Sequence, residues 1–177
     1  MLLAPEEALA IDVHGGTEAA VLVPLYEDPD GVVHAVFTRR RHDLRRHAGE
    51  ISFPGGRRDH DEPLLDTALR EAQEEIGLAP RLVDVVGALR PVGTFVTGYA
   101  IYPFVGVLEA PPEWVLADTE VAEVLELRLD AVRAGKGERR LVRRGIPFRT
   151  PTYEVGPHMI WGATARIVSD LLTRTSR

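Results

Sequence analysis

The 177-residue sequence contains no cysteine and a single lysine, Lys136. Without cysteine the chain has no disulfides, thiolate metal sites or cysteine nucleophiles, so a metal ion would be held by carboxylates, histidines or main-chain oxygens. The sequence also lacks an apolar run as long as a membrane-spanning helix, and its first ten residues contain no basic leader. We therefore expect a cytoplasmic protein that does not contact a membrane.

Basic residues are also fewer than acidic ones. The chain has 21 basic and 27 acidic residues, a formal net charge of −6. This balance argues against nucleic acid as a partner, because non-specific binding to it requires a basic face. The hydrophobic share of 45% is typical of globular proteins. A chain of this length suits one core, so we expect a single domain over residues 1–177.

Apolar, β-branched runs outnumber helical patterns along the chain, and turn residues such as Gly and Pro separate them. Two segments have helical spacing, and they must cover a sheet. The expected fold class is therefore α/β of the α+β type, with a mixed β-sheet sandwiched between helices. Strands are predicted at residues 17–26, 32–38, 51–53, 82–89, 100–108, 121–127, 138–143 and 148–155, and helices at 63–77 and 160–173.

The segment 63–77 has the clearest helical pattern. Pro63 suits the first helical position, and Gly77 is placed to end the helix. Apolar residues recur at spacings of four, three and four, which predicts one dry face. The residues of this face are Leu65, Leu69, Ala72 and Ile76.

Three glutamates of this helix, Glu71, Glu74 and Glu75, fall on an arc away from the predicted dry face at about 100° per residue. Like charges at this spacing repel by roughly 0.2–0.5 kcal/mol per pair, and Arg70 offsets only part of that cost. Such a cluster suits Mg²⁺ or Mn²⁺, which prefer oxygen ligands. The alternative is a solvated acidic face with a surface Arg70–Glu74 ion pair, and the helix alone favours this alternative.

The residues around the helix favour the metal site over the solvated acidic face. They follow, without a gap over residues 56–78, the spacing Gly, five residues, Glu, seven residues, Arg-Glu, apolar, any, Glu-Glu, any, Gly, apolar. This pattern resembles the signature of the Nudix hydrolases, and its seven fixed positions give a chance match of ~10⁻⁸ per starting point. The resemblance implies a Nudix fold and hydrolysis of a phosphate-phosphate bond. The matching residues are Gly56, Glu62, Arg70, Glu71, Glu74, Glu75 and Gly77.

The resemblance also implies a set of metal ligands. The Gly56 carbonyl, Glu71 and Glu75 would hold the principal Mg²⁺ or Mn²⁺, and Glu74 would be a further ligand or the general base. Metal-assisted attack of water on one phosphorus would then cleave a pyrophosphate. In this family the residues at Glu62 and Arg70 more often orient the loop and the helix.

The identity of the base stays open. Some members of the family use a glutamate from a distant loop, and the local equivalents are Glu120 and Glu123. Taken singly, each of these two residues is better explained as an ordinary exposed acid beside a strand. Glu74 is the alternative on the helix itself.

The segment 37–56, FTRRRHDLRRHAGEISFPGG, resembles the additional motif of the coenzyme A pyrophosphatase branch of the family. Two places depart from it: residues 36–37 replace a leucine pair, and Arg41 replaces a small Ser or Ala. The C-terminal stretch 160–166, IWGATAR, is also similar to this branch. The resemblance implies coenzyme A, or its acyl form, as substrate. The matching positions are Thr38, Arg40, Arg45, Gly49, Phe53, Pro54, Gly55 and Gly56.

Coenzyme A carries a pyrophosphate and a 3′-phosphate, which favours several cations close to the metal. We assign substrate binding to Arg40 and Arg45, which lie on the motif, with His47 as either a phosphate contact or a loop cap. Gly55 lets the main chain approach a phosphate or metal closely. The other cations of this segment, Arg39, Arg41 and Arg46, are better explained as a solubilising loop.

Three aromatic residues, Tyr99, Tyr102 and Trp114, are candidates for stacking on adenine, although isolated aromatics more often belong to a core or its rim. Two other functions remain. One is a Nudix enzyme for ADP-ribose, NADH or a nucleoside triphosphate, and the other is a non-catalytic nucleotide-sensing module. In each case the partner is a small molecule, and the sequence leaves the oligomeric state, including a homodimer, open.

Overall fold

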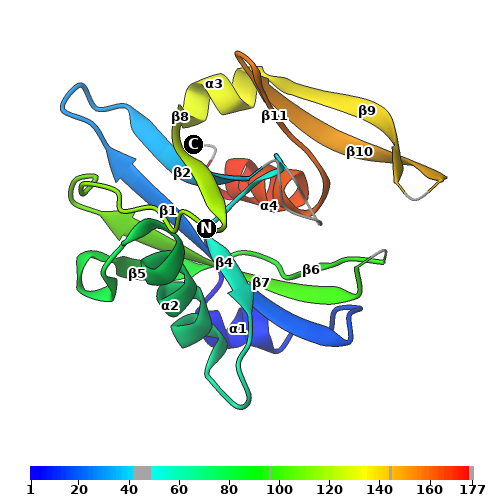
Figure 1. Cartoon of the computed structure of the whole chain (residues 1–177), viewed down its shortest axis with the longest axis horizontal. Coiled ribbons are helices and arrows are strands. Elements are labelled where there is room, and N and C mark those ends of the chain that lie inside the picture. Colours follow the sequence, from blue (N-terminus) through cyan, green and yellow to red (C-terminus); the bar gives the residue numbers. More distant parts are fainter. Residues whose placement is uncertain (42–48, 96, 144, 176–177) are drawn as a thin grey trace.

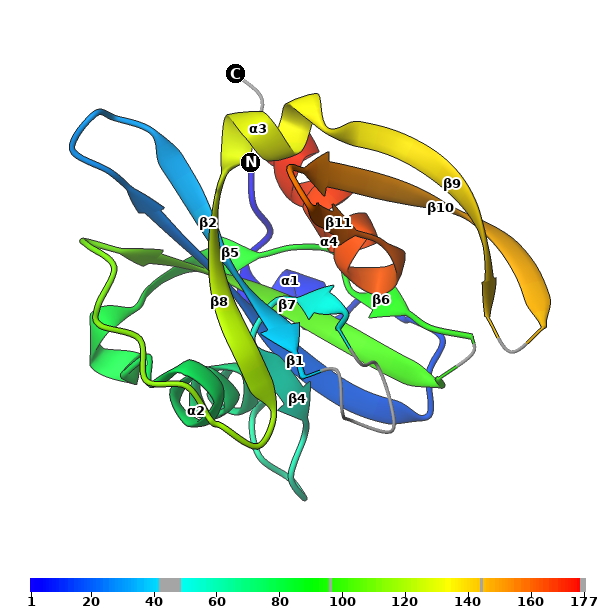
Figure 2. The same ribbon diagram turned by 45° about the horizontal axis from the view of Figure 1, so that its top comes forward.

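The computed structural model describes residues 1–41, 49–95, 97–143 and 145–175 (Figures 1 and 2). Its helices are α1 (Pro5–Leu9), α2 (Leu64–Ile76), α3 (Leu129–Ala134) and α4 (Gly162–Arg174), with a 3₁₀ turn η1 (Pro80–Leu82). Its strands are β1 (Thr17–Glu27), β2 (Val33–Arg40), β3 (Ile51–Ser52), β4 (Gly55–Arg57), β5 (Asp84–Ala88), β6 (Val92–Gly93), β7 (Tyr99–Leu108), β8 (Val121–Arg128), β9 (Lys136–Arg143), β10 (Ile146–Val155) and β11 (His158–Ile160).

The main sheet is mixed. Its central order is β3-β2-β1-β7-β5, while β4 pairs with β1, β6 with β7 and β8 with β2. The β1–β7 pair is parallel from Thr17↔Tyr99 to Tyr26↔Leu108, and the other described pairs are antiparallel. A second sheet has the order β11-β10-β9.

Apolar side chains of β1 alternate between the two faces of the main sheet, as the period of a strand requires. Ala20 and Leu22 belong to the core layer beneath α2, whereas Val23 and Leu25 belong to the layer that includes α4. Figure 1 shows these two helices on opposite sides of the sheet. The expected α+β fold with a sheet between helices is therefore confirmed.

The helix α2 begins one residue later than the sequence suggested. Pro63 lies at the N-cap, and Gly77 ends the helix in the left-handed region with φ 70°. A Cβ at Gly77 would lie 2.8 Å from the Cβ of Val115, so this position is both conformationally and sterically suited to glycine.

The buried face of α2 is rotated from the predicted one. Leu65 and Leu69 are only half-buried, and Glu75 is 6% exposed. The prediction that the three glutamates project outward as a group is therefore wrong for Glu75, which lies among the residues turned to the sheet. The buried residues of the helix are Leu64, Thr67, Ala68, Ala72, Glu75 and Ile76.

Several short elements were not expected from the sequence. They are α1, α3, β4, β6 and β11, of six residues or fewer. The strands expected at 138–143 and 148–155 are present as β9 and β10, which form an antiparallel hairpin. Among the helices that the structure describes, none combines the length and apolarity required to cross a membrane.

Candidate active site

Gly55 and Gly56 follow a bend at Pro54 and begin β4, which pairs with β1, although the sequence predicted a turn at these glycines. They place the start of the signature segment against α2. Gly55 has φ 157°, and a Cβ there would lie 2.3 Å from the carbonyl oxygen of Ala20. A Cβ at Gly56 would lie 2.5 Å from the carboxyl carbon of Glu71. Both positions therefore require glycine, the first for the sheet and the second for the approach of the Glu71 carboxylate.

The Glu75 carboxylate is held next to the start of β4. The Gly55 N–H donates to its Oε2 at 3.2 Å, and Nη1 of Arg40 lies 3.9 Å from its Oε1. Burial raises the pKa of Glu75 to about 7, although the Gly55 hydrogen bond and the Arg40 charge oppose the change. A carboxylate in this setting favours a nearby cation.

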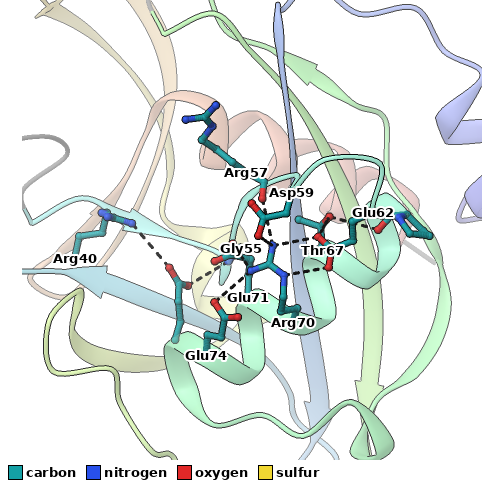
Figure 3. A network of polar contacts seen from close by, with 11 residues as sticks. Arg40, Gly55, Arg57, Asp59, Glu62, Thr67, Arg70, Glu71 and Glu74 are labelled. Atoms are coloured by element: carbon teal, nitrogen blue, oxygen red, sulfur yellow. Dashed lines mark hydrogen bonds and ion pairs between the residues drawn. The ribbon is translucent and has the colours of Figure 1, made fainter.

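Arg70 joins the loop before α2 to the helix (Figure 3). Its Nε and Nη2 donate to the two oxygens of Glu62 at 3.0 and 3.1 Å, a two-point contact. The Thr67 hydroxyl adds a hydrogen bond to Glu62 at 2.7 Å. The Arg70 hydrogen bonds, followed by that of Thr67, lower the pKa of Glu62. These are the contacts of residues that orient the loop, the role implied by the resemblance.

The third donor of Arg70, Nη1, contacts the acids of the helix. It lies 2.9 Å from the Glu71 carboxylate and 3.2 Å from that of Glu74. The alternative Arg70–Glu74 ion pair is therefore present, and the Glu74 side chain is 59% exposed. Burial raises the pKa of Glu71, with Arg70 opposing the change. Figure 3 shows Glu71 and Glu74 side by side on the same turn of α2, both directed at Arg70.

The structure brings Glu120 to the same site from a distant part of the sequence. Nη2 of Arg40 lies 3.6 Å from a Glu120 carboxylate oxygen, so Arg40 lies between Glu75 and Glu120. Glu123, the other distant candidate, is paired instead with Arg39 at 2.6 Å. Of these two glutamates, Glu120 is therefore the one near the buried carboxylate, whereas Glu123 lies in β8.

The group best suited to a divalent ion is formed by Glu71 and Glu75, one helical turn apart, and the main chain of Gly56. Within the described residues, no three acidic or imidazole groups converge closely enough to hold an ion in this conformation. Arg70 and Arg40 instead supply the positive charge next to these carboxylates. The residue types and the glycine-lined approach fit a hard cation, provided that the arginine contacts rearrange.

The remaining predicted site residues have different outcomes. Arg45 and His47 lie outside the described residues, as does Arg46. Tyr102 is buried, which excludes it as an exposed stacking surface, and Trp114 donates its indole N–H to Glu126.

Sequence reasoning missed two contributors to the site. Thr67 supports Glu62 from the buried face of α2, and the predicted dry face did not include it. Arg41 contacts the segment that carries Glu120. Its departure from the small residue of the motif was the only sequence signal for that role.

Comparison with known proteins agrees with this geometry. Residues 16–145 match the NUDIX domain family model. The chain belongs to the Nudix hydrolase family. Enzymes of this family generally use divalent metal ions.

Two bacterial relatives, both described as uncharacterized Nudix hydrolase NudL, cover most of the chain. The protein of Cronobacter sakazakii is 40% identical over 157 residues, which is 87% of this chain and 80% of the relative. The protein of Pectobacterium atrosepticum is 38% identical over 167 residues, 93% of this chain and 85% of the relative. This Nudix chain is therefore similar to these two NudL proteins over at least 80% of their length.

Solved structures support the fold. A MutT/nudix family protein from Enterococcus faecalis has a TM-score of 0.61 at 13% identity, covering 93% of this chain and 63% of that one. The M. smegmatis Nudix hydrolase RenU has a TM-score of 0.58 at 20% identity, with coverages of 70% and 84%. The Nudix domain of Shewanella oneidensis NrtR, complexed with ADP ribose, has a TM-score of 0.55 at 18% identity, with coverages of 73% and 85%. At these identities the likeness concerns the fold alone.

Proposed function

We propose that this Nudix hydrolase cleaves the pyrophosphate bond of coenzyme A, or of acyl-coenzyme A, to adenosine 3′,5′-bisphosphate and 4′-phosphopantetheine or its acyl form. The observation that carries the proposal is the segment 37–56, whose Arg40 contacts both the buried Glu75 and Glu120. The segment resembles the motif of the coenzyme A pyrophosphatase branch. It ends at Gly55 and Gly56, where β4 begins, so the specificity motif and the proposed cleavage site are contiguous.

The hydrogen bonds between Arg40 and the described residues Gly49 and Glu50 support this proposal. The Arg40 N–H donates to the Glu50 carbonyl at 3.0 Å, and the Gly49 N–H donates to the Arg40 carbonyl at 3.1 Å. Gly49 adopts φ 70°, which favours glycine at this motif position. The described residues on either side of positions 42–48 are therefore joined to each other beside Arg40. A sequence that carries several cations between these two places suits a substrate with three phosphates.

Each residue of the site has a proposed part in hydrolysis. Glu71, Glu75 and the Gly56 carbonyl hold Mg²⁺ or Mn²⁺, which would acidify the attacking water and offset phosphate charge when bound. Glu120 or Glu74 accepts the proton of that water. Arg40 binds a phosphate oxygen of the substrate, since its guanidinium already lies between two acids of the site.

A substrate panel tests the proposal. Coenzyme A, dephospho-coenzyme A, ADP-ribose, NADH and ATP are each incubated with the protein and Mg²⁺ or Mn²⁺, and kcat/KM is measured with product identification. We expect the highest value for coenzyme A and a lower one for dephospho-coenzyme A, which lacks the 3′-phosphate. Much faster turnover of ADP-ribose would overturn the assignment. Absence of turnover with every substrate and both metals would favour a nucleotide-sensing module.

A further inference from the structure

We propose that Arg41 is a positioning residue that fixes the turn at residues 118–120, and with it the Glu120 carboxylate, beside Glu75. The inference deepens the proposed function and rests on it where Glu120 takes part in hydrolysis. It concerns the one cationic position at which this chain departs from the small residue of the motif.

Arg41 contacts the turn through both its main chain and its side chain. Its N–H donates to the Glu120 carbonyl at 3.0 Å, and its Nη1 donates to the Asp118 carbonyl. The turn is closed internally, since the N–H groups of Glu120 and Val121 both donate to the Ala117 carbonyl, at 2.9 and 3.0 Å. Arg41 therefore links a tight turn to the end of β2 at two points.

Three consecutive arginines at the end of β2 contact different partners on the segment that carries Glu120 and Glu123. Arg39 binds the Glu123 carboxylate, Arg40 lies near the Glu120 carboxylate, and Arg41 binds main-chain carbonyls. A carboxylate partner can be replaced by solvent or by a ligand, whereas a carbonyl acceptor restrains the backbone itself. The contacts of Arg41 are thus suited to holding the turn in place when Arg40 changes partner.

The pairing of β2 with β8 explains why the turn needs this support. Arg39 pairs with Glu123 and Arg40 with Val121, so Ala122 has no partner and the register shifts at a bulge. Bulges bend a strand and often redirect a side chain near a functional site. Glu120 precedes this bulge, and its side chain is 52% exposed. The neighbouring β2 main chain and Arg41 therefore restrain a turn that packing holds only weakly.

The departure from the motif provides the test. A Ser or Ala at position 41 could keep the main-chain bond to Glu120 but could not reach the Asp118 carbonyl. Arg41→Ala restores a residue of the motif, so it should not prevent folding. Arg41→Lys keeps the charge but loses the planar guanidinium. Arg149→Ala is the matched control, because Arg149 is 78% exposed and pairs with Glu138 on the hairpin of β9 and β10.

The first measurement is amide hydrogen exchange, which does not depend on the substrate. We expect Arg41→Ala to speed exchange of the amides of residues 118–121 by about tenfold, with the rest of the chain unchanged. Arg149→Ala should leave this turn unchanged. Equal protection of the turn in Arg41→Ala and the unaltered protein would overturn the proposal, whatever the substrate proves to be.

The second measurement is steady-state kinetics with the best substrate of the panel. We expect Arg41→Ala to lower kcat by about 10- to 100-fold with little change in KM, and Arg41→Lys to have a smaller effect. In a Glu120→Gln background, Arg41→Ala should have no further effect on kcat. A raised KM with unchanged kcat would overturn the proposal in favour of a substrate contact, as would full additivity of the two substitutions. Failure of coenzyme A alone would refute the proposed substrate and leave both measurements on Arg41 valid.

Discussion

Glu71 and Glu75 lie one helical turn apart on α2, and their surroundings differ. Glu75 is almost fully withdrawn from solvent, with the Gly55 N–H as its hydrogen-bond donor, whereas Glu71 is half-buried against Gly56 and contacts Arg70. Two carboxylates this close and this dry repel unless a positive charge lies near both. Arg70 and Arg40 supply it here, and a divalent ion would supply more charge at a single point.

Glu71→Gln tests the role of the half-buried carboxylate. The amide keeps the shape of the side chain but removes the charge that a divalent ion needs. We expect kcat to fall by several orders of magnitude and Mn²⁺ binding to weaken by at least about tenfold, with the fold retained. Turnover assays, Mn²⁺ titration calorimetry and circular dichroism measure these three properties. Retained activity would refute the assignment of Glu71 as a principal metal ligand.

Glu62→Ala tests the pair that joins the loop to α2. The substitution removes both Arg70 contacts and the Thr67 hydrogen bond in a partly buried position. We expect the free energy of unfolding to fall by about 1.5–3 kcal/mol in urea titrations, the range for hydrogen bonds to charged groups. The control is Asp59→Asn, because Asp59 is 74% exposed and 3.8 Å from Arg70. Equal effects of the two substitutions would contradict the structural role of Glu62.

Within β4, Gly55 and Gly56 each leave no room for a Cβ, but for different reasons, and separate substitutions can distinguish them. Gly56→Ala places a methyl against the Glu71 carboxylate, so we expect kcat to fall by about 100-fold, with a small loss of stability. Gly55→Ala places a methyl against the main chain of β1, so we expect about 1–3 kcal/mol of destabilisation.

Gly16→Ala is the control for both substitutions, since a Cβ there meets nothing within 4 Å. Activity assays and urea titrations on the three variants separate the two effects. An active Gly56→Ala variant would show that activity does not require the close approach of the Glu71 carboxylate to Gly56.

The helix α2 also shows where sequence reasoning succeeds and fails. Its extent and its glycine end follow from the apolar period and from the φ that only glycine adopts easily. Its dry face follows only in part. Ala72 and Ile76 are buried as predicted, but Leu65 and Leu69 are half-buried, because periodicity gives weight to large side chains. The close approach of α2 to the sheet instead selects the small Ala68 and Ala72 for the centre of the contact. Glu75 lies on that side, so its burial was missed.

The short helices and the position of Glu120 were also not predicted, and the reasons are physical. The helices α1 and α3 are five and six residues long, which is too short for an apolar period to be recognised. The nearness of Glu120 to Glu75 depends on the pairing of β2 with β8, and strand order is not encoded locally. The family motif could identify the acids of α2, but it could not show that Glu123 forms an ion pair with Arg39.

On the scale of the whole molecule, one sheet supports two apolar layers, and only one of them lies beneath the acids of α2. Leu171 of α4 is fully buried in the other layer. Leu171→Ala should therefore lower the free energy of unfolding by about 2–5 kcal/mol while leaving kcat of the folded protein unchanged. Urea titrations and active-fraction-corrected assays measure both quantities.

Val142→Ala is the surface control for this prediction, since Val142 is 69% exposed. Its effect should stay within about 0.5 kcal/mol. A loss below about 1 kcal/mol for Leu171→Ala would contradict the tight packing of α4 on the sheet.

We propose that the carboxylates beside Gly55 and Gly56 direct cleavage of the coenzyme A pyrophosphate. The most direct test is mass analysis of coenzyme A incubated with the protein and Mg²⁺ or Mn²⁺, with a parallel sample containing a chelator. We expect adenosine 3′,5′-bisphosphate and 4′-phosphopantetheine in equal amounts, formed only with the metal. Intact coenzyme A after prolonged incubation with either metal, or the same products in the chelated sample, would contradict it.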